Sequence, residues 1–115
     1  MSEPNLLVAC LCAQWCGTCR DYRVVFDALR DEIGAAALFV WVDIEDEADA
    51  LGDTDVEDFP TLLIAHGEDV LFFGPLTPQP STLGRLVRGA LNGDLREQVD
   101  ARLVGLPARV RALRR

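Results

Sequence analysis

The segment that most constrains this chain is Trp15-Cys16-Gly17-Thr18-Cys19, in which two cysteines are separated by two residues. It lies between an apolar run, residues 6–13, and residues 21–33, whose apolar side chains recur at helical spacing. This succession predicts a buried strand that leads into a helix, with the cysteine pair at the turn between them. We therefore expect both cysteines at the beginning of the helix.

The start of a helix favours a reactive cysteine. Backbone N–H groups there lack intrahelical partners, and the helix dipole adds partial positive charge. A thiolate is stabilised at such a position, and the thiolate is the nucleophile in thiol–disulfide exchange. Cys19 follows Cys16 by three residues and so returns to the same helix face. We expect Cys16 to be the attacking thiolate and Cys19 to resolve the mixed disulfide.

Two other interpretations of the cysteine pair compete with exchange chemistry. A Cys-x-x-Cys pair can be half of a structural zinc site, which needs a second pair of ligands. The other candidates are Cys10, Cys12 and His66. We expect Cys10 and Cys12 to point to opposite faces of their strand, which disfavours a four-ligand cage. Alternatively, the cysteines are small buried hydrophobes, and this is our interpretation of Cys10 and Cys12.

Length and charge limit the function classes. A chain of 115 residues, half of them hydrophobic, is typical of one domain. Its net charge of −8 argues against general nucleic-acid binding. The sequence has no apolar run near the roughly 20 residues that span a membrane, and its acidic N-terminus does not match a secretory signal. We expect a cytoplasmic protein.

The other elements follow from hydrophobic periodicity and turn residues. Gly34 should end the first helix, and Ser81 should cap the last helix of the core, which Gly93 ends. A tight turn at Gly67-Glu68 predicts a hairpin. Between the two helices we expect a strand at residues 38–44 that is too apolar to be half exposed, and a short helix at residues 46–51 in an acidic segment. The two strands of the hairpin should follow at residues 61–65 and 70–73.

On these residues the chain resembles the thioredoxin-fold family. The match rests on Trp15-Cys16-Gly17-Thr18-Cys19, on Phe59-Pro60-Thr61, and on Gly74 at the end of the next apolar run, and it covers about residues 5–93. The resemblance implies a minimal thioredoxin-like α/β fold, with a central four-stranded mixed sheet flanked by helices. The longer family form has a further strand and helix before the first strand here, and we expect that N-terminal βα unit to be missing.

The family resemblance also implies an activity and a site. In that family the proline before the third strand is cis and lies beside the cysteine pair, where it helps to hold an extended substrate peptide. The chain would then be a thiol–disulfide oxidoreductase that acts on protein disulfides, with an upstream thiol reductase as partner and no bound cofactor or metal. The implied catalytic residues are Cys16 and Cys19, and the implied substrate-binding residues are Trp15, Gly17, Thr18, Phe59 and Pro60.

Three positions depart from the family pattern. Thr18 stands where thioredoxins usually have proline, which leaves the redox poise open. Cys10 stands at the position of the family's buried acid, and Trp41 at that of its lysine partner. Cys10 and Trp41 in place of the acid–lysine pair favour one alternative, a thioredoxin-like binding or chaperone module with little redox turnover. A further alternative is a protein that binds a soft metal such as Cu(I) through its cysteine cluster.

Residues 94–115 lie beyond the family core at residues 1–93. Their apolar residues predict a C-terminal helix interrupted at Pro107, with the stripe Leu95, Val99, Leu103 and Leu106, followed by a basic tail of Arg109, Arg111, Arg114 and Arg115. We expect this extra helix to cover surface left bare by the missing N-terminal unit. A docking element for a partner or a second copy is the alternative.

Overall fold

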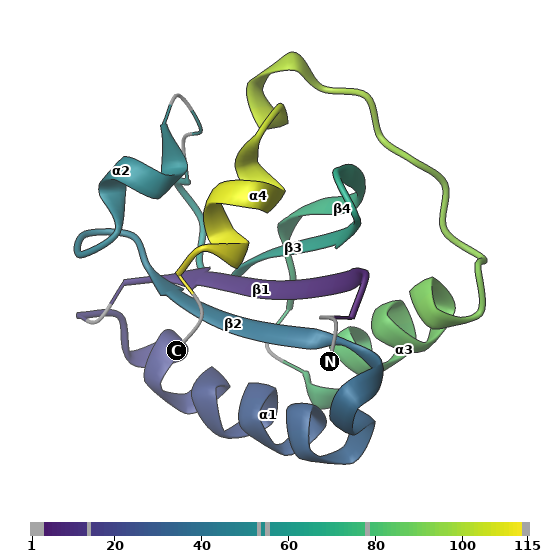
Figure 1. Cartoon of the computed structure of the whole chain (residues 1–115). Coiled ribbons are helices and arrows are strands. Elements are labelled where there is room, and N and C mark those ends of the chain that lie inside the picture. The colour runs from purple at the N-terminus through teal and green to yellow at the C-terminus, as the bar shows by residue number, and fades with distance from the viewer. Residues whose placement is uncertain (1–3, 14, 53, 55, 78, 114–115) are drawn as a thin grey trace.

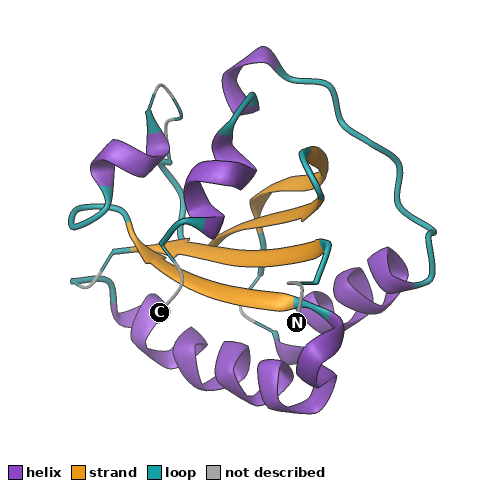
Figure 2. Cartoon of the chain, in the orientation of Figure 1, coloured by secondary structure: helices purple, strands orange, loops and turns teal. Residues whose placement is uncertain are grey.

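A computed structural model of the chain describes residues 4–13, 15–52, 54, 56–77 and 79–113. Strands and helices alternate in the first half of the chain, and helices end the second half (Figures 1 and 2). In chain order the elements are β1 (Leu6–Cys12), α1 (Gly17–Ile33), the 3-10 turn η1 (Gly34–Ala36), β2 (Leu38–Asp43), α2 (Ala48–Leu51), β3 (Thr61–His66), β4 (Asp69–Pro75), α3 (Pro80–Leu91), the 3-10 turn η2 (Ala101–Leu103) and α4 (Leu106–Arg111).

The four strands form one mixed sheet in the order β2-β1-β3-β4. β1 pairs in parallel with β2 and antiparallel with β3, and β3 pairs antiparallel with β4. This confirms the predicted four-stranded mixed sheet. β1 is a central strand, and all seven of its residues are buried. β2 is an edge strand, so several of its side chains are only half-buried, contrary to our expectation for residues 38–44.

Helices cover both faces of the sheet. In Figure 1, α1 and α3 lie below it, whereas α2 and α4 lie above it. Because side chains alternate between the faces of a strand, each face builds its own core. The core under α1 and α3, which we call the lower core, includes Val8, Cys10, Cys12, Cys19, Tyr22, Phe26, Leu62, Ile64, Leu83 and Val87. The upper core includes Leu7, Ala9, Leu11, Val42, Leu63, Leu103, Leu106 and Val110.

Helix α1 places the cysteine motif at the end of the central strand. Its buried face consists of Cys19, Tyr22, Phe26 and Leu29, at spacings of three and four residues. The helix begins at Gly17, four residues before the periodic signal at Asp21, because small and polar residues of the first turn carry no apolar period. It ends at Gly34, whose φ of +66° favours glycine.

Helix α3 begins differently from the prediction. Gln79 is the N-cap and Pro80 occupies the first turn, so Ser81 lies inside the helix rather than capping it. Proline suits this position because its fixed φ matches the helix and its missing N–H would have no intrahelical acceptor.

The C-terminal segment is not the single helix that the apolar stripe predicted. Residues 94–100 form an extended connection in which Val99 is 94% exposed, and η2 and α4 follow it. Pro107 lies in the first turn of α4 and does not interrupt a helix. An extra C-terminal helix is present as expected, and Leu103, Leu106 and Val110 pack in the upper core. Arg114 and Arg115 lie outside the described residues.

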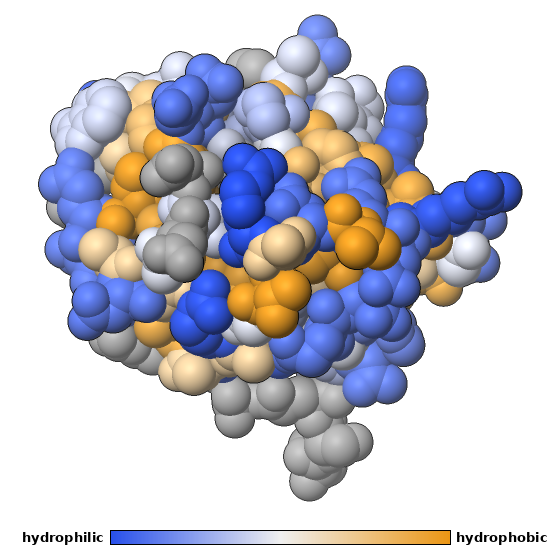
Figure 3. Space-filling model, turned by 90° about the horizontal axis from the view of Figure 1, so that it is seen from above, coloured by the Kyte–Doolittle hydropathy of each residue, from blue (hydrophilic) through white to orange (hydrophobic). Residues whose placement is uncertain are grey.

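Two arginines tie α4 to distant parts of the chain. Arg109 donates a hydrogen bond of 2.7 Å to the carbonyl of Ala50 in α2. Arg111 donates one of 2.6 Å to the carbonyl of Asn5, next to β1. The outer face of this region, seen from above in Figure 3, mixes hydrophilic and apolar patches. In the described part of the chain, no helix is long and apolar enough to cross a membrane.

Candidate functional site

Cys16 lies where the sequence predicted it, at the start of α1. It is the N-cap residue and has an extended backbone, with φ of −83° and ψ of 121°. Its N–H donates to the carbonyl of Ala13 at 3.0 Å, and its carbonyl accepts from the N–H of Arg20 at 3.2 Å. Cys16 is a free, half-buried thiol that packs against the lower core. The cysteine is therefore held at the positive end of a 17-residue helix.

Cys19 is bonded to Cys12, not to Cys16. The disulfide joins the last residue of β1 to the first turn of α1, across a Cα–Cα distance of 5.8 Å. Both cysteines are 1% exposed. The predicted motif pair, Cys16 and Cys19, is therefore close in sequence but unbonded, and the disulfide lies beneath the surface that carries Cys16.

Cys10 and Cys12 point to the same face of β1, contrary to our expectation. Residues two apart on a strand share a face, and both side chains belong to the lower core. Their sulfurs are 3.7 Å apart. Burial raises the pKa of the Cys10 thiol far above its ordinary value, against a smaller opposing effect of the positive charge of Arg23. Cys10 is therefore a neutral thiol inside the core.

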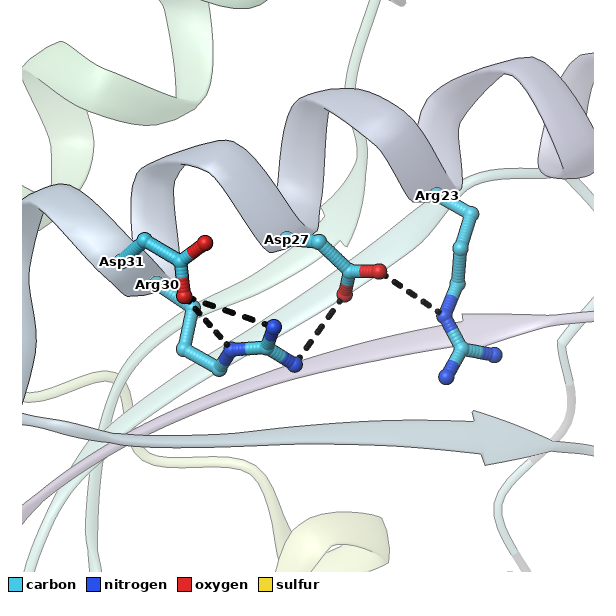
Figure 4. A network of polar contacts seen from close by, with 4 residues as sticks. All are labelled: Arg23, Asp27, Arg30 and Asp31. Atoms are coloured by element: carbon cyan, nitrogen blue, oxygen red, sulfur yellow. Dashed lines mark hydrogen bonds and ion pairs between the residues drawn. The ribbon is translucent and has the colours of Figure 1, made fainter.

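The cross-strand neighbour of Cys10 is Trp41, so the two departures from the family pattern lie side by side in the sheet. The guanidinium of Arg23 lies over the Trp41 ring, 4.8 Å from its centroid. Arg23 also pairs with Asp27 at 3.6 Å, and Asp27 pairs with Arg30 at 3.3 Å (Figure 4). A neutral thiol beside an indole covered by a guanidinium thus replaces a buried acid–lysine pair.

An aromatic contact shapes the surface near the motif. Trp15 is 65% exposed, and its ring meets that of Phe59 edge to face with 5.6 Å between centroids. The indole N–H of Trp15 donates to the carboxylate of Glu45. The Phe59–Pro60 peptide bond is cis, and the Pro60 carbonyl accepts from the N–H of Leu76 at 3.1 Å. Two predicted substrate-binding residues, Trp15 and Phe59, are thereby in direct contact.

The remaining predicted binding residues, Gly17 and Thr18, are exposed in the first turn of α1. A cavity of about 390 Å³ lies near the start of α1, between this helix and β2. Its lining combines one sulfur with groups of both charges: Ala13, Cys19, Arg20, Arg23, Trp41, Asp43 and Asp46. His66 is the exposed last residue of β3, next to the hairpin turn.

Among the described residues, no three or more histidine, cysteine and acidic side chains are grouped so as to hold a metal ion.

Sequence reasoning missed Cys12 as a partner of Cys19. The signal was present in the spacing, because the last residue of a strand and the first turn of the following helix are adjacent in space. Cys12 also shares its strand face with Cys10, which places it on the side of the sheet that α1 covers. The motif spacing drew attention to Cys16 instead.

The comparisons with known proteins agree with the fold. The family model described as Thioredoxin matches residues 1–74. The chain is 32% identical to a thioredoxin of Listeria monocytogenes over 70 residues, which are 61% of this chain and 68% of that protein. It is 29% identical to a thioredoxin of Bacillus subtilis over 70 residues, which are 61% of this chain and 67% of that one.

Solved structures show the same fold at lower identity. A thioredoxin of Fasciola hepatica superposes with a TM-score of 0.66 at 24% identity, over 75% of this chain and 81% of that one. The germline-specific thioredoxin Deadhead of Drosophila melanogaster gives a TM-score of 0.65 at 16% identity, over 76% of this chain and 97% of that one. These similarities concern the architecture described above.

Proposed function

The chain belongs to the thioredoxin family, and from this premise we propose that it exchanges a Cys16/Cys19 dithiol with disulfides of client proteins. Family membership and a disulfide at the motif support thiol–disulfide oxidoreductase activity in general. The observation that carries the finer proposal is the position of Cys16: a free, half-buried thiol that forms the N-cap of α1.

The reaction starts from the form in which Cys16 and Cys19 are both reduced. The Cys16 thiolate attacks one sulfur of a client disulfide, so a mixed disulfide forms and the other client sulfur leaves as a thiolate that takes up a proton. The Cys19 thiolate then attacks the Cys16 sulfur. This forms the Cys16–Cys19 disulfide and releases the second client thiol, so the client gains the two electrons that the dithiol loses.

The surface around Cys16 supports a protein client. Trp15 and Phe59 offer an aromatic contact surface beside the motif, while Gly17 and Thr18 leave the first turn of α1 open to an approaching chain. Pro60, whose peptide bond with Phe59 is cis, is itself buried and would act by holding Phe59 in place. The electrons reside in the dithiol, so the reaction needs no bound cofactor, and a thiol reductase is the expected source of new electrons.

The test is reduction of insulin by dithiothreitol, followed by the turbidity of the released B chain. We expect the wild-type chain to accelerate the reaction and Cys16→Ser to return it to the uncatalysed rate. Cys10→Ala is the matched control, because it also removes a thiol but one that is fully buried, and it should keep the wild-type rate. Equal rates for the wild type and Cys16→Ser would refute the proposal.

A second candidate is a binding or chaperone module with little redox turnover. The Cys12–Cys19 disulfide favours it, because Cys19 cannot resolve a mixed disulfide while it is bonded to Cys12. Suppression of aggregation of reduced insulin, equal in the wild type and Cys16→Ser without any acceleration of reduction, would support the module and exclude the enzyme.

The two free thiols are evidence about the cellular compartment in which the chain works. Cys10 and Cys16 are free thiols, whereas Cys12 is already bonded to Cys19. Unpaired thiols are typical of proteins in reducing compartments. We propose the cytoplasm as the place where the chain works.

A further inference from the structure

Cys19 has two cysteines with which it could form a disulfide. It is bonded to Cys12 at the end of β1, and it follows the free thiol of Cys16 by one helical turn. We propose that Cys12 is a third redox-active cysteine, which competes with Cys16 for Cys19 and moves the disulfide between the surface and the core. The inference rests on the proposed function, since it assumes that Cys16 is the exchanging thiol.

The two disulfides that Cys19 could form differ in exposure. Cys12 and Cys19 are each 1% exposed, so their bond is almost fully buried, although Cys19 lines the cavity between α1 and β2. Cys16 is half-buried and lies beside the exposed Trp15 and Gly17, so a bond from Cys16 to Cys19 would reach the surface. The two forms have the same oxidation state, because each contains one disulfide and one thiol among Cys12, Cys16 and Cys19. They differ in whether a large reaction partner can approach the disulfide.

Cys12 is well fixed for this role. It pairs with Asp43 at the end of β1, and its carbonyl accepts from the N–H of Ile44 at 3.0 Å. Cys19 is equally constrained in the first turn of α1. Cys16 differs from both, because it is the N-cap, where the backbone leaves the helix. The exchange therefore requires the Cys16 side chain to move and the Cys19 side chain to turn toward it. The backbone of β1 and α1 can stay where it is.

The transfer step is an internal thiol–disulfide exchange. The Cys16 thiolate attacks the sulfur of Cys19, the Cys16–Cys19 bond forms, and the Cys12–Cys19 bond breaks. Cys12 leaves as a thiolate and takes up a proton, which balances the proton that Cys16 gave up. The step involves no net oxidation and therefore needs no other reactant. The reverse step carries a disulfide inward.

The consequence is an oxidised protein that keeps a reactive surface thiol. After the chain has reduced a client, the Cys16–Cys19 disulfide passes inward and Cys16 is released. A reductant then reaches the buried disulfide through Cys16, which brings the bond back to the surface. Without Cys16, the Cys12–Cys19 disulfide has no such route.

Cys10 supplies a control inside the same core. Its sulfur is 3.7 Å from that of Cys12, yet Cys10 is fully buried and remains a thiol. Burial also keeps its pKa far above the ordinary value, so it is a poor attacking group. Removal of Cys10 should leave the disulfide exchange unchanged.

The first experiment maps the disulfide of the oxidised full-length chain. Free thiols are blocked with N-ethylmaleimide, and chymotryptic cleavage after Trp15 separates Cys12 from Cys16 and Cys19. In the wild type and in Cys10→Ala we expect two peptides joined by the Cys12–Cys19 bond, with the label on Cys16. In Cys12→Ala we expect one peptide with a Cys16–Cys19 bond and no label on Cys16. A wild-type chain that contains the Cys16–Cys19 disulfide alone would overturn the inference.

The second experiment separates a mobile disulfide from a static one. Reduction of the Cys12–Cys19 bond by dithiothreitol is followed in the wild type and in Cys16→Ser, a substitution that places a favourable residue at the N-cap. We expect Cys16→Ser to slow the reduction at least tenfold, and Cys10→Ala to match the wild type. Equal rates in the wild type and Cys16→Ser would make the disulfide structural and overturn the inference.

These outcomes are distinct from failure of the proposed function. The insulin assay measures turnover in the wild type and in Cys16→Ser. It does not show which cysteine is bonded to Cys19 in the oxidised chain. Turnover that depends on Cys16, together with equal reduction rates of the buried disulfide, would preserve the oxidoreductase and remove the role of Cys12. Loss of both effects would remove the oxidoreductase as well.

Discussion

Cys10 and Cys16 show how differently one residue type behaves at two places in the same short segment. Cys16 forms the N-cap of α1 and is partly open to solvent, whereas Cys10 lies in the middle of a central strand and is fully buried. The motif predicted Cys16 at the start of a helix, and the apolar run before it predicted a buried Cys10. The motif alone could not predict the partner of Cys19, because that sulfur belongs to Cys12, at the end of the preceding strand.

The burial of Cys10 predicts a loss of stability at alkaline pH. Its thiol has an ordinary pKa of 9.0, which burial raises in the folded chain. The unfolded chain therefore releases this proton first, so the stabilisation is complete below about pH 8 and falls as the pH rises. The free energy of unfolding should decrease with a slope that approaches about 1.4 kcal/mol per pH unit from this group.

Urea unfolding between pH 7 and pH 10.5 measures this effect. Cys10→Ala should show a shallower decrease than the wild type over the alkaline part of the range. The pKa of Tyr22 is also raised, mainly by burial and less by the charge of Cys10, so the burial part of its effect is common to both proteins. Parallel pH profiles for the two proteins would contradict the burial of a neutral thiol at this position.

In residues 94–113, an extended connection followed by α4 is found in place of the single helix that the apolar stripe predicted. The apolar stripe correctly selected Leu103 and Leu106, but a single helix was wrong, because the chain must cross from the lower side of the sheet to the upper side (Figure 1). Periodicity reports which residues are apolar and cannot show this crossing. We propose that residues 1–93 form the thioredoxin-like domain and residues 94–115 an extension that completes its upper core.

A single buried side chain tests the packing of α4. Leu106 is fully buried, whereas the nearby Val104 is 77% exposed. Leu106→Ala should lower the free energy of unfolding by about 2–5 kcal/mol, and Val104→Ala should change it by less than about 0.5 kcal/mol. Chemical denaturation measures both values. Similar small effects for the two variants would mean that α4 does not belong to the core in solution.

Deletion of residues 94–115 tests the packing of the whole C-terminal segment against the sheet. It would expose the side of β1 and β3 that carries Leu7, Ala9 and Leu63, which are fully buried in the complete chain. We expect a clearly lower melting temperature by circular dichroism. A truncated chain that melts at the wild-type temperature would instead favour a docking element that leaves the domain intact.

The whole molecule is a sheet with two separate cores, and the disulfide belongs to the lower one. The mixed four-stranded sheet was implied by the family resemblance, and the β3–β4 hairpin was predicted from the turn at Gly67-Glu68. The edge position of β2 and its partial exposure were not, since the sequence of β2 is as apolar as that of a central strand. Neighbours in space, rather than composition, decide how far such a strand is buried.

The disulfide should make the stability of the whole molecule depend on redox conditions. Closure of the loop between residues 12 and 19 stabilises the folded chain by about 2.5 kcal/mol in the chain-entropy model. Addition of dithiothreitol should therefore lower the free energy of unfolding of the wild type by about that amount. Cys19→Ala removes the cysteine common to both disulfides and should show no such change. An equal response of both proteins would contradict a disulfide at Cys19.

Trapping of the mixed disulfide tests the proposal that Cys16 attacks client disulfides. In Cys19→Ser the resolving thiol is absent, so a client captured by the reduced protein should remain attached. With insulin as the client, we expect peptide mapping by mass spectrometry to find one adduct, at Cys16, that dithiothreitol releases. The wild type should show this adduct only transiently. An adduct at Cys10 or Cys12, or no adduct in Cys19→Ser, would contradict the account.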